Sequence, residues 1–480
     1  MEPAKIYVAG EWTPGKAEPI AVTNPYTGEE PVRPVRVALV GAASADQVGA
    51  ACRAAKTAFA EYGRWPAYRR AEVVAGLRDA VRGRKEELAQ ILVAQCGKPV
   101  TLARAEVERC LETLTLAAEC PRWMSGHEVP LDSSPVGRGM LGLVRRIPLG
   151  PIAAITPFNF PLNLTAHKLG PALAVGCTVV HKPASATPLD AFVLAEILDG
   201  LGLPPGTYNL VPGRGAEVGE PLCASKELRA ITFTGSGDVG RWLTTRAGMK
   251  KLTVELGSTA AAIVAADADL EFAVPRLVRG AFGFAGQSCI SLQRAFVERG
   301  IFDDFCDRFV AETETLGVGD PAREDVLVGP MISAAEADRA FAWIEEARAG
   351  GAMVLTGGTR EGNVIRPTVL AGVRLEMKVV EREVFAPVVS LVPYDTLDEA
   401  IAWTNRNDYG LNLSIFTKNL DAALRAAEEL EAGAVLVNES PTWRADIMPY
   451  GGVKGSGMGR EGTRYVFEEL TEPKLIAFRR

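Results

Sequence analysis

The sequence has 480 residues, enough for about three domains of average size. Hydrophobic residues make up 48% of it and charged residues 23%, a balance that excludes a disordered or fibrous protein. The net charge of −7 provides no basic surface for nucleic acid or an acidic membrane, so we expect neither as a partner.

The first residues carry no signal-peptide pattern, and no apolar run reaches the length of a membrane span, so we expect a cytoplasmic protein. The 8 cysteines are scattered and form no CxxC pair, which indicates reduced thiols rather than a disulfide framework. The 3 histidines lack the spacing of zinc ligands, so no metal site is predicted. Any nucleophile must therefore be activated without a metal.

The chain begins with a helical region. Apolar residues at three-to-four spacing predict amphipathic helices over 45–63, from Tyr68 to Gly97, and over 100–119. The segment 130–150 contains a short strand with arginines in mid-run, and it could form a hairpin that leaves the main body.

Two long stretches of alternating strands and helices follow. In the first, residues 151–260, short apolar runs alternate with helices, the clearest of which spans 189–201. A second alternation runs over 261–438. Because this pattern is typical of parallel sheets covered by helices, we predict two α/β domains. The end of the chain, 470–480, has a strand-like pattern.

The first alternation contains two weak signals for a dinucleotide. The segment 233–240, FTGSGDVG, satisfies GxGxxG between a strand and a helix, where backbone amides can face a pyrophosphate. An ordinary strand-to-helix turn would look the same. Lys182 and Ser185 follow another strand, where open α/β sheets bind ligands, although a lysine that caps a turn is the alternative.

Cys289 is the candidate nucleophile. It follows a glycine turn in GQSC, no histidine is adjacent to it, and a buried structural thiol is the alternative interpretation. Asn159 could donate a hydrogen bond to the oxyanion that forms when a thiol attacks a carbonyl. Glu255 could activate the water that removes the resulting thioester.

Seven segments occur in order along the chain: TPFNFPLN, HKPAS, FTGSGDVG, VELG, GQSC, EVFAPV and PYGGVKGSGMGREG. Together they resemble the aldehyde dehydrogenase superfamily over nearly the whole length. The GQSC and RAD segments are similar to the lactaldehyde, phosphonoacetaldehyde and non-phosphorylating glyceraldehyde-3-phosphate branches. The resemblance implies two Rossmann-like, doubly wound α/β domains and a small β element for oligomerisation. The implied segments are a dinucleotide-binding domain (1–122 and 148–254), a catalytic domain (255–442) and a bridging element (123–147 and 460–480).

The same resemblance implies the roles of individual residues. Cys289 would be the nucleophile, Glu255 the general base, and Asn159 with the Cys289 backbone amide the oxyanion hole. The NAD or NADP cofactor would contact Ile155, Thr156, Pro157, Phe158, Lys182, Ser185, Gly215, Phe233, Gly235, Ser236, Val239, Leu256, Glu383 and Phe385.

Two departures from the family pattern bear on specificity. Many NAD-preferring members have a glutamate where this chain has Ser185. The site is therefore expected to tolerate NADP alongside NAD. Arg214 either assists there or is a solvated surface residue. Arg444 would suit an anionic substrate, with a loop salt bridge to Asp446 or Glu439 as the alternative. Gly283 stands where succinate-semialdehyde enzymes tend to carry an arginine. We expect a small polar or anionic aldehyde.

Three other functions remain open at this point. A CoA-acylating dehydrogenase would share the fold and the cysteine, but such enzymes generally lack the base, so Glu255 favours hydrolysis. A non-catalytic dinucleotide-binding protein would not need Asn159, Glu255 and Cys289 together, and a thiol hydrolase without cofactor would leave the HKPAS and FTGS segments without a purpose. The strand-like elements at 140–147 and 470–478 further imply a homodimer or homotetramer.

Overall fold

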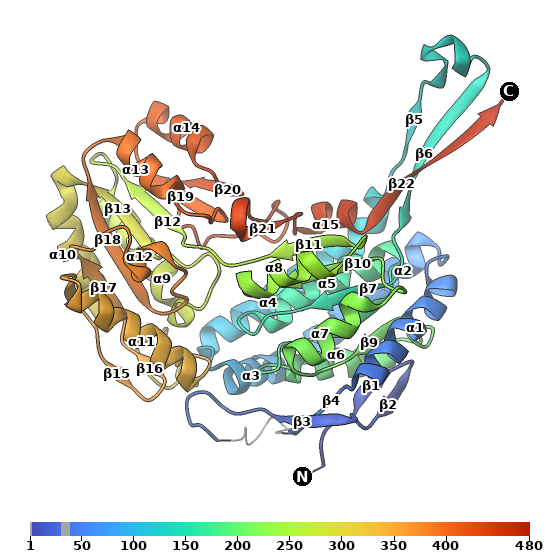
Figure 1. Ribbon diagram of the computed structural model, residues 1–480, viewed down its shortest axis with the longest axis horizontal. Coiled ribbons are helices and arrows are strands. Elements are labelled where there is room, and N and C mark those ends of the chain that lie inside the picture. The colour runs from blue at the N-terminus through green and yellow to red at the C-terminus, as the bar shows by residue number, and fades with distance from the viewer. Residues whose placement is uncertain (1, 30–38) are drawn as a thin grey trace.

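Two large sheets, each covered by helices, form the two halves of the molecule (Figure 1). The computed structural model describes residues 2–29 and 39–480. Residues 1 and 30–38, which fall within the predicted segment 1–122, lie outside the described residues. The architecture confirms the predicted α/β class with two parallel-type sheets, while the domain boundaries stay a prediction.

The first sheet has the strand order β2-β1-β9-β8-β7-β10-β11-β21. Strands β9, β8, β7, β10 and β11 are parallel, and β1 and β21 pair antiparallel at the two sides. The strands are β1 (Ile6–Val8), β2 (Glu11–Thr13), β7 (Ile152–Ile155), β8 (Val179–Lys182), β9 (Tyr208–Leu210), β10 (Ala230–Thr234), β11 (Lys251–Glu255) and β21 (Gly457–Met458).

Helices cover both faces of this sheet because its strands are apolar on both sides. On β7, Ile152 and Ala154 join one core cluster, while Ala153 and Ile155 join another on the opposite face. The helices are α1 (Ala45–Tyr62), α2 (Ala67–Gly83), α3 (Lys85–Cys96), α4 (Val100–Trp123), α5 (Pro161–Val175), α6 (Leu189–Asp199), α7 (Gly215–Ala224) and α8 (Gly237–Arg246).

The helical stretch expected from Tyr68 to Gly97 is two helices. It breaks after Gly83, a poor helix former, at Arg84, which has a non-helical φ of −118°. The Arg84 guanidinium bonds Glu87 and reaches Glu196 on α6, so the break is held by ion pairs. The predicted end at Gly97 is confirmed, because this glycine caps α3 in the left-handed conformation.

The second sheet has the order β14-β17-β18-β13-β12-β19-β20 and is parallel except for β14. Its strands are β12 (Ala261–Val264), β13 (Arg294–Glu298), β14 (Met353–Thr356), β17 (Thr368–Ala371), β18 (Val388–Tyr394), β19 (Asn412–Phe416) and β20 (Ala434–Val437). Its helices are α9 (Leu270–Phe282), α10 (Phe302–Glu314), α11 (Ala334–Ala349), α12 (Lys378–Glu381), α13 (Leu397–Asn405) and α14 (Leu420–Glu429). Alternate residues of β12 again enter two different cores, so both faces are covered.

A three-stranded antiparallel arm projects from the body beside the first sheet (Figure 1). It contains β5 (His127–Val129), β6 (Met140–Pro148) and β22 (Thr471–Arg479), and β6 pairs with β22 over nine residues. The hairpin expected at 130–150 therefore leaves the main body. The residues before β22 form helix α15 (Thr463–Glu469), which packs on α4 and α5.

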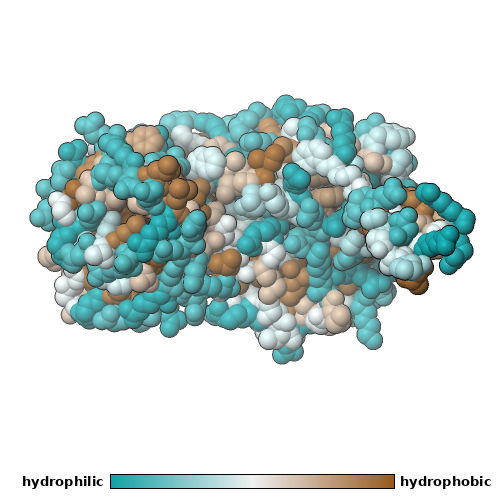
Figure 2. All heavy atoms as spheres, turned by 90° about the horizontal axis from the view of Figure 1, so that it is seen from above, coloured by the Kyte–Doolittle hydropathy of each residue, from teal (hydrophilic) through white to brown (hydrophobic). Residues whose placement is uncertain are grey.

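The remaining strands are short pairs: β3 (Ala17–Ala21) with β4 (Leu39–Ala42), and β15 (Arg360–Glu361) with β16 (Val364–Ile365). Hydrophilic side chains cover most of the face shown in Figure 2, and the apolar ones are scattered among them in small groups. Among the helices of the described residues, none combines the length and the apolar character needed to cross a bilayer.

Candidate active site

The candidate site lies where an edge of the first sheet meets an edge of the second. Strands β7, β8, β10 and β11 are parallel, so the residues after them gather at one edge. Cys289 and Glu383 precede β13 and β18, whose amino ends share an edge of the second sheet. Asn159 Nδ2 donates to Gln287 O across this junction at 3.0 Å, and the rings of Phe158 and Phe385 meet edge-to-face at 5.8 Å.

The turn before Cys289 is unusual in its backbone. Phe284 and Ala285 have φ values of 53° and 54°, and Gly286 follows at 66°. A Cβ at Gly286 would also lie 2.3 Å from Ala386 O, so only glycine fits there. The buried Gln287 amide fixes the turn, because its Oε1 accepts from Ile332 N at 2.8 Å.

Cys289 differs from the other cysteines in its exposure. All eight cysteines lie in the described residues; seven are buried, and Cys289 alone is partly exposed. Its Sγ lies 2.9 Å from the Tyr450 hydroxyl. Burial raises the pKa of the Cys289 thiol to about 12, whereas the Tyr450 bond and the Arg444 charge act to lower it. Its partial exposure does not match the alternative of a buried structural thiol, and the role of nucleophile stays a prediction.

Asn159 is held from both sides. Lys98 Nζ donates to its backbone oxygen at 2.6 Å and also forms a buried ion pair with Glu106. The Glu106 carboxylate in turn accepts from Leu162 N at 3.0 Å, at the start of α5. The side-chain amide has two hydrogens, and Gln287 O takes one of them.

Glu255 is the last residue of β11 and is only 2% exposed. Neither carboxyl oxygen has a hydrogen-bond partner within the described residues. Gly451 makes room for it, since a Cβ there would approach Glu255 Oε1 to 2.7 Å. Burial, and then the negative charge of Glu461, raise the pKa of Glu255 well above its ordinary value.

Glu461 behaves in the opposite way. Its carboxylate accepts from Lys168 Nζ at 2.7 Å and lies 3.4 Å from Arg444 Nη2. Although burial acts to raise it, these two cations hold the pKa of Glu461 at about 2. The site thus contains one carboxyl group whose pKa is lowered by two cations beside one whose pKa is raised by burial.

Lys182 and Ser185 lie where they were predicted, at the carboxyl end of β8. Lys182 is buried, and its Nζ donates only to Pro183 O at 3.2 Å, with no carboxylate partner in the described part of the chain. Burial lowers the pKa of Lys182 to about 8. Ser185 Oγ donates to Gly213 O at 2.8 Å, and Arg214 pairs with Glu18 at 2.7 Å on the surface.

The other cofactor residues predicted in the first sheet lie at or after the carboxyl ends of its parallel strands. Phe233 lies on β10, and Gly235 follows this strand. Ser236 is the N-cap residue of α8, and Val239 on the first turn of this helix is 44% exposed. Gly215 begins α7. Residues 155–158 follow the end of β7, and Leu256 follows β11.

Glu383 reaches back toward the first sheet. Its Oε1 accepts from Ser258 N at 2.9 Å, and burial raises the pKa of this carboxyl to about 7 against that bond. Phe385, two residues after Glu383, has a φ of 50°, and its ring contacts the ring of Phe158. The fold therefore brings the predicted residues of both sheets together.

A buried polar cluster beside Cys289 was not foreseen. Asp446 Oδ1 accepts from Arg109 Nη2 at 2.7 Å and lies 2.8 Å from His167 Nε2. His167 Nε2 also lies 3.2 Å from Arg444 Nη2. Helical spacing could have indicated part of this cluster, because Asn163 and His167, four residues apart on α5, share a face.

Arg444 is nearly buried, with 6% of its side chain exposed. Its ion pair with Asp446 runs from Nε and is long, at 4.0 Å, and this Nε has no hydrogen-bond partner in the described residues. Its guanidinium lies over the Tyr450 ring, 3.6 Å from the centroid. The other expected alternative, a salt bridge to Glu439, is wrong, because Glu439 pairs with Arg276 at 3.5 Å.

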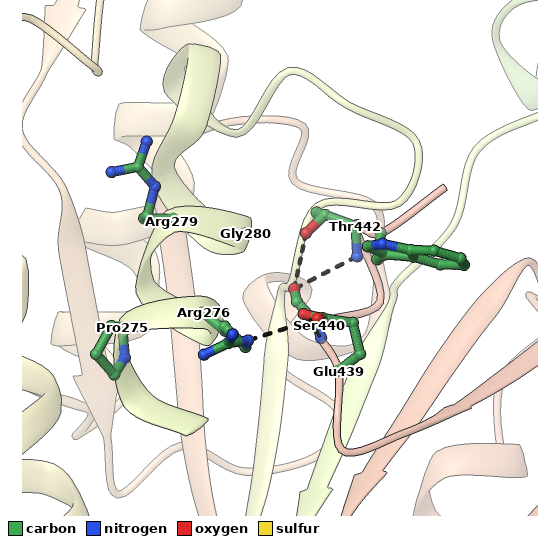
Figure 3. A pocket seen from close by; sticks show the side chains of 8 residues that line it. Pro275, Arg276, Arg279, Gly280, Glu439, Ser440 and Thr442 are labelled. Atoms are coloured by element: carbon green, nitrogen blue, oxygen red, sulfur yellow. Dashed lines mark hydrogen bonds and ion pairs between the residues drawn. The ribbon is translucent and has the colours of Figure 1, made fainter. Parts of the chain in front are cut away.

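That surface pair lines a separate pocket of about 500 Å³ between α9 and residues 439–443. Figure 3 shows Arg276 and Glu439 joined across it, with Ser440 bonded to Thr442 at its back. Arg276 therefore provides a nearby arginine outside the cluster around Cys289.

Known proteins resemble this chain over nearly its whole length. The model of the aldehyde dehydrogenase family matches residues 12–476. The chain is 42% identical to 3-sulfolactaldehyde dehydrogenase of Priestia megaterium, covering 98% of this chain and 97% of that one. It is 38% identical to lactaldehyde dehydrogenase of Methanocaldococcus jannaschii, covering 98% and 99%.

Solved structures agree closely with the fold. Aldehyde dehydrogenase 21 of Physcomitrella patens, in complex with the reaction product succinate, superimposes with a TM-score of 0.95 at 40% identity, covering 100% of this chain and 98% of that one. Glyceraldehyde-3-phosphate dehydrogenase GapN of Methanocaldococcus jannaschii, complexed with NADP, gives 0.92 at 38% identity, covering 97% and 100%.

Proposed function

The chain belongs to the aldehyde dehydrogenase family, and we propose that it oxidises a small anionic aldehyde to its carboxylic acid with NADP or NAD. The observation that carries this proposal is the meeting of three groups at one junction. Cys289, Asn159 and Glu255 come from different elements, and each has the chemistry that one step of the reaction needs.

Cys289 acts first. Its thiolate attacks the aldehyde carbon, and the carbonyl oxygen becomes an oxyanion. The second hydrogen of the Asn159 amide and the backbone amide of Cys289 would donate to that oxygen. A bound nicotinamide supplies the hydride acceptor. The aldehyde carbon then remains on Cys289 as a thioester.

Glu255 completes the turnover. Its carboxylate takes a proton from a water molecule, the oxygen of that water attacks the thioester, and Cys289 leaves as a thiolate. Neither carboxyl oxygen of Glu255 has a hydrogen-bond partner within the described residues, so both are available for water. A CoA-acylating enzyme would have no use for this base, so its presence supports hydrolysis.

The cofactor would be held by residues of both sheets. Lys182 supports this proposal because a buried cation without an anionic partner fits a phosphate or the ribose hydroxyls. Ser185 adds no negative charge that would repel a 2′-phosphate. GapN of Methanocaldococcus jannaschii is complexed with NADP. We therefore propose that NADP is accepted, with NAD as a second cofactor.

Replacing Ser185 with glutamate tests this assignment. A carboxylate at that position would repel the 2′-phosphate and bond the ribose hydroxyls, so kcat/KM with NADP is expected to fall about tenfold or more, with less change for NAD. Initial rates with each cofactor measure the ratio, and Ser185→Ala is the control. An unchanged ratio in Ser185→Glu would place the adenosine ribose elsewhere.

Two arginines support an anionic substrate. The Nε of Arg444 has no hydrogen-bond partner in the described residues, and Arg109 is 31% exposed beside the same Asp446. Guanidinium groups bind carboxylate, sulfonate and phosphate oxygens well. Relatives of this chain are named for 3-sulfolactaldehyde and lactaldehyde.

A panel of aldehydes tests the proposed function. Lactaldehyde, sulfolactaldehyde, succinate semialdehyde and glyceraldehyde 3-phosphate would be offered with NAD and with NADP, and the reduced cofactor followed by absorbance. We expect reduction without CoA and a preference for the anionic members over neutral lactaldehyde. If only added CoA permits turnover, the acylating alternative is correct.

The Arg444→Met variant tests the substrate class separately. The ratio of kcat/KM for an anionic over a neutral aldehyde is expected to fall about tenfold, because one charge-assisted bond is lost. The ratio is used because effects on the nucleophile cancel in it. Arg276→Met, outside the cluster, should leave the ratio unchanged, and an equal result for both variants would remove Arg444 from substrate recognition.

We also propose that the arm joins subunits into a homo-oligomer. Strand β22 is an edge of the arm and exposes Leu475 and Phe478. An exposed apolar edge strand is usually covered by another chain. Light scattering of the full chain would give the number of subunits.

A further inference from the structure

Over residues 2–29 and 39–480, no histidine forms a hydrogen bond with the proposed nucleophile. Within the described residues, the one hydrogen-bond partner of Cys289 Sγ is the Tyr450 hydroxyl, at 2.9 Å. We propose that Tyr450, polarised by the guanidinium of Arg444, is the hydrogen-bond donor that stabilises the thiolate of Cys289. This inference rests on the proposed function, in which Cys289 is the nucleophile.

The direction of the bond follows from the chemistry of the two groups. While Cys289 is a thiol, either atom can donate. A thiolate has no hydrogen, so the phenol must then donate, and a bond to a charged acceptor is about twice as strong as a neutral one. The contact therefore favours the ionised form of the sulfur.

Arg444 strengthens this donor. Its guanidinium centre lies 3.6 Å from the centroid of the Tyr450 ring, and its charge is permanent. A cation over the ring draws electron density from the phenol and makes its hydrogen more positive. Arg444 is fixed there by Glu461 at 3.4 Å and His167 at 3.2 Å, so the stack does not depend on a mobile side chain.

The other charged groups that face the sulfur are two acids. Glu255 and Glu383 both act against ionisation of Cys289. Burial raises the pKa of each of them, to about 7 for Glu383. Burial of the sulfur itself is the largest effect against its ionisation, and Tyr450 and Arg444 are the groups that act in the opposite direction.

The same bond serves the end of the cycle. When the thioester is hydrolysed, the bond between carbon and sulfur breaks and its electron pair stays on the sulfur. The thiolate that leaves is again the form that Tyr450 stabilises. Tyr450 keeps its own proton in both steps, so it is a hydrogen-bond donor and not a general base.

The test is the pH dependence of Cys289 alkylation by iodoacetamide, with the modified residue located by mass spectrometry. The seven other cysteines are buried, which favours selective labelling. In Tyr450→Phe the apparent pKa of alkylation is expected to rise by about one unit, so the rate at about pH 7.5 falls about tenfold. The reaction uses no aldehyde and no cofactor.

Tyr62→Phe is the matched control. Tyr62 is also buried, and its hydroxyl makes one hydrogen bond of 2.9 Å, to Leu173 O on α5. Its removal tests the loss of a buried tyrosine hydroxyl that does not touch Cys289. Its alkylation profile should match that of the unmodified protein.

Arg444→Gln provides a second, independent variant. Its apparent pKa should rise as well, and the rise in the double variant should be smaller than the sum of the single ones, because Arg444 acts partly through Tyr450. Identical profiles for the unmodified protein and Tyr450→Phe would overturn the inference. If Tyr450→Phe does not fold, an unchanged profile in Arg444→Gln overturns it instead.

Failure of the proposed function gives a different signature. If Cys289→Ser kept its turnover, Cys289 would not be the nucleophile, whatever its alkylation profile. If turnover is lost in Cys289→Ser but the alkylation profile ignores Tyr450, only the present inference fails.

Discussion

Replacing Cys289 with serine is expected to lower kcat for aldehyde oxidation by about 10⁴-fold or more. The serine hydroxyl ionises far less readily than a thiol, and among the described residues the hydrogen-bond partner at this position is the Tyr450 hydroxyl rather than a histidine. The position is otherwise preserved, because serine has nearly the same shape and can keep the contact with Tyr450. Formation of reduced cofactor, followed by absorbance, measures the loss.

The control for this variant is Cys306→Ser. Cys306 is a buried cysteine of α10, only 9% exposed, and it belongs to the core of the second sheet. Its replacement should affect stability rather than chemistry. Cofactor binding should also survive in Cys289→Ser, and retention of more than about one per cent of kcat would assign the attack to another group.

Replacing Glu255 with glutamine is expected to separate the two halves of the reaction. Reduced cofactor should form in a burst of about one equivalent per subunit, followed by a steady-state rate about 10²–10⁴-fold lower. Glutamine keeps the size of the side chain but cannot take a proton from water, so the acyl group stays on Cys289. Mass spectrometry of the quenched protein should show the added acyl mass.

The pH dependence provides a second readout for Glu255. Both Glu255 and Cys289 act in their deprotonated forms, and burial raises the pKa of both. Activity of the unmodified protein should therefore increase as the pH rises above about 7, because each increment of pH produces more of both active forms. In Glu255→Gln the rate of the burst should still increase with pH, because Cys289 must ionise. The rate of the slow phase should no longer show the increase with pH that comes from deprotonation of the carboxyl group.

Glu439→Gln is the matched control for this variant. Glu439 lies in the surface pocket and pairs with Arg276 (Figure 3). Its replacement should give no burst. A steady-state rate in Glu255→Gln equal to that of this control would mean that another group activates the water.

The sequence was informative wherever a residue follows or precedes a strand. Lys182, Glu255 and Asn159 could be placed because the ends of parallel strands meet at one edge, whatever the details of packing. Local chemistry also predicted the end of α3, since Gly97 can adopt the left-handed conformation.

Contacts between distant segments could not be predicted in the same way. Tyr450 lies 161 residues from Cys289, and the pattern PYGG gives no sign that its hydroxyl reaches the sulfur. The clamp of Lys98 on Asn159 joins residues 61 apart through packing of α4 against α5. Strand β17 has only four residues and begins directly after Pro367, so its sequence pattern alone is weak.

Arg444 illustrates what a motif leaves open. The sequence allowed an anion site or a loop salt bridge, and the two are not separated by residue type. In the structure its charge faces Glu461 and Asp446, so the expected salt bridge to Asp446 is present, although it is long at 4.0 Å. Its Nε has no hydrogen-bond partner in the described residues, so the proposal of an anionic substrate still stands to be tested.

The junction of the two sheets also shapes how such a protein can change over generations. Lys182 and Ser185 lie on the loop after β8, and their hydrogen bonds go to Pro183 and Gly213 rather than to the cluster around Cys289. If Lys182 and Ser185 hold the cofactor as proposed, substitutions there would alter the cofactor preference without moving the sulfur, its tyrosine or its arginine. A descendant of this chain could exchange one electron carrier for another, and so enter a different branch of metabolism, with its acyl chemistry intact.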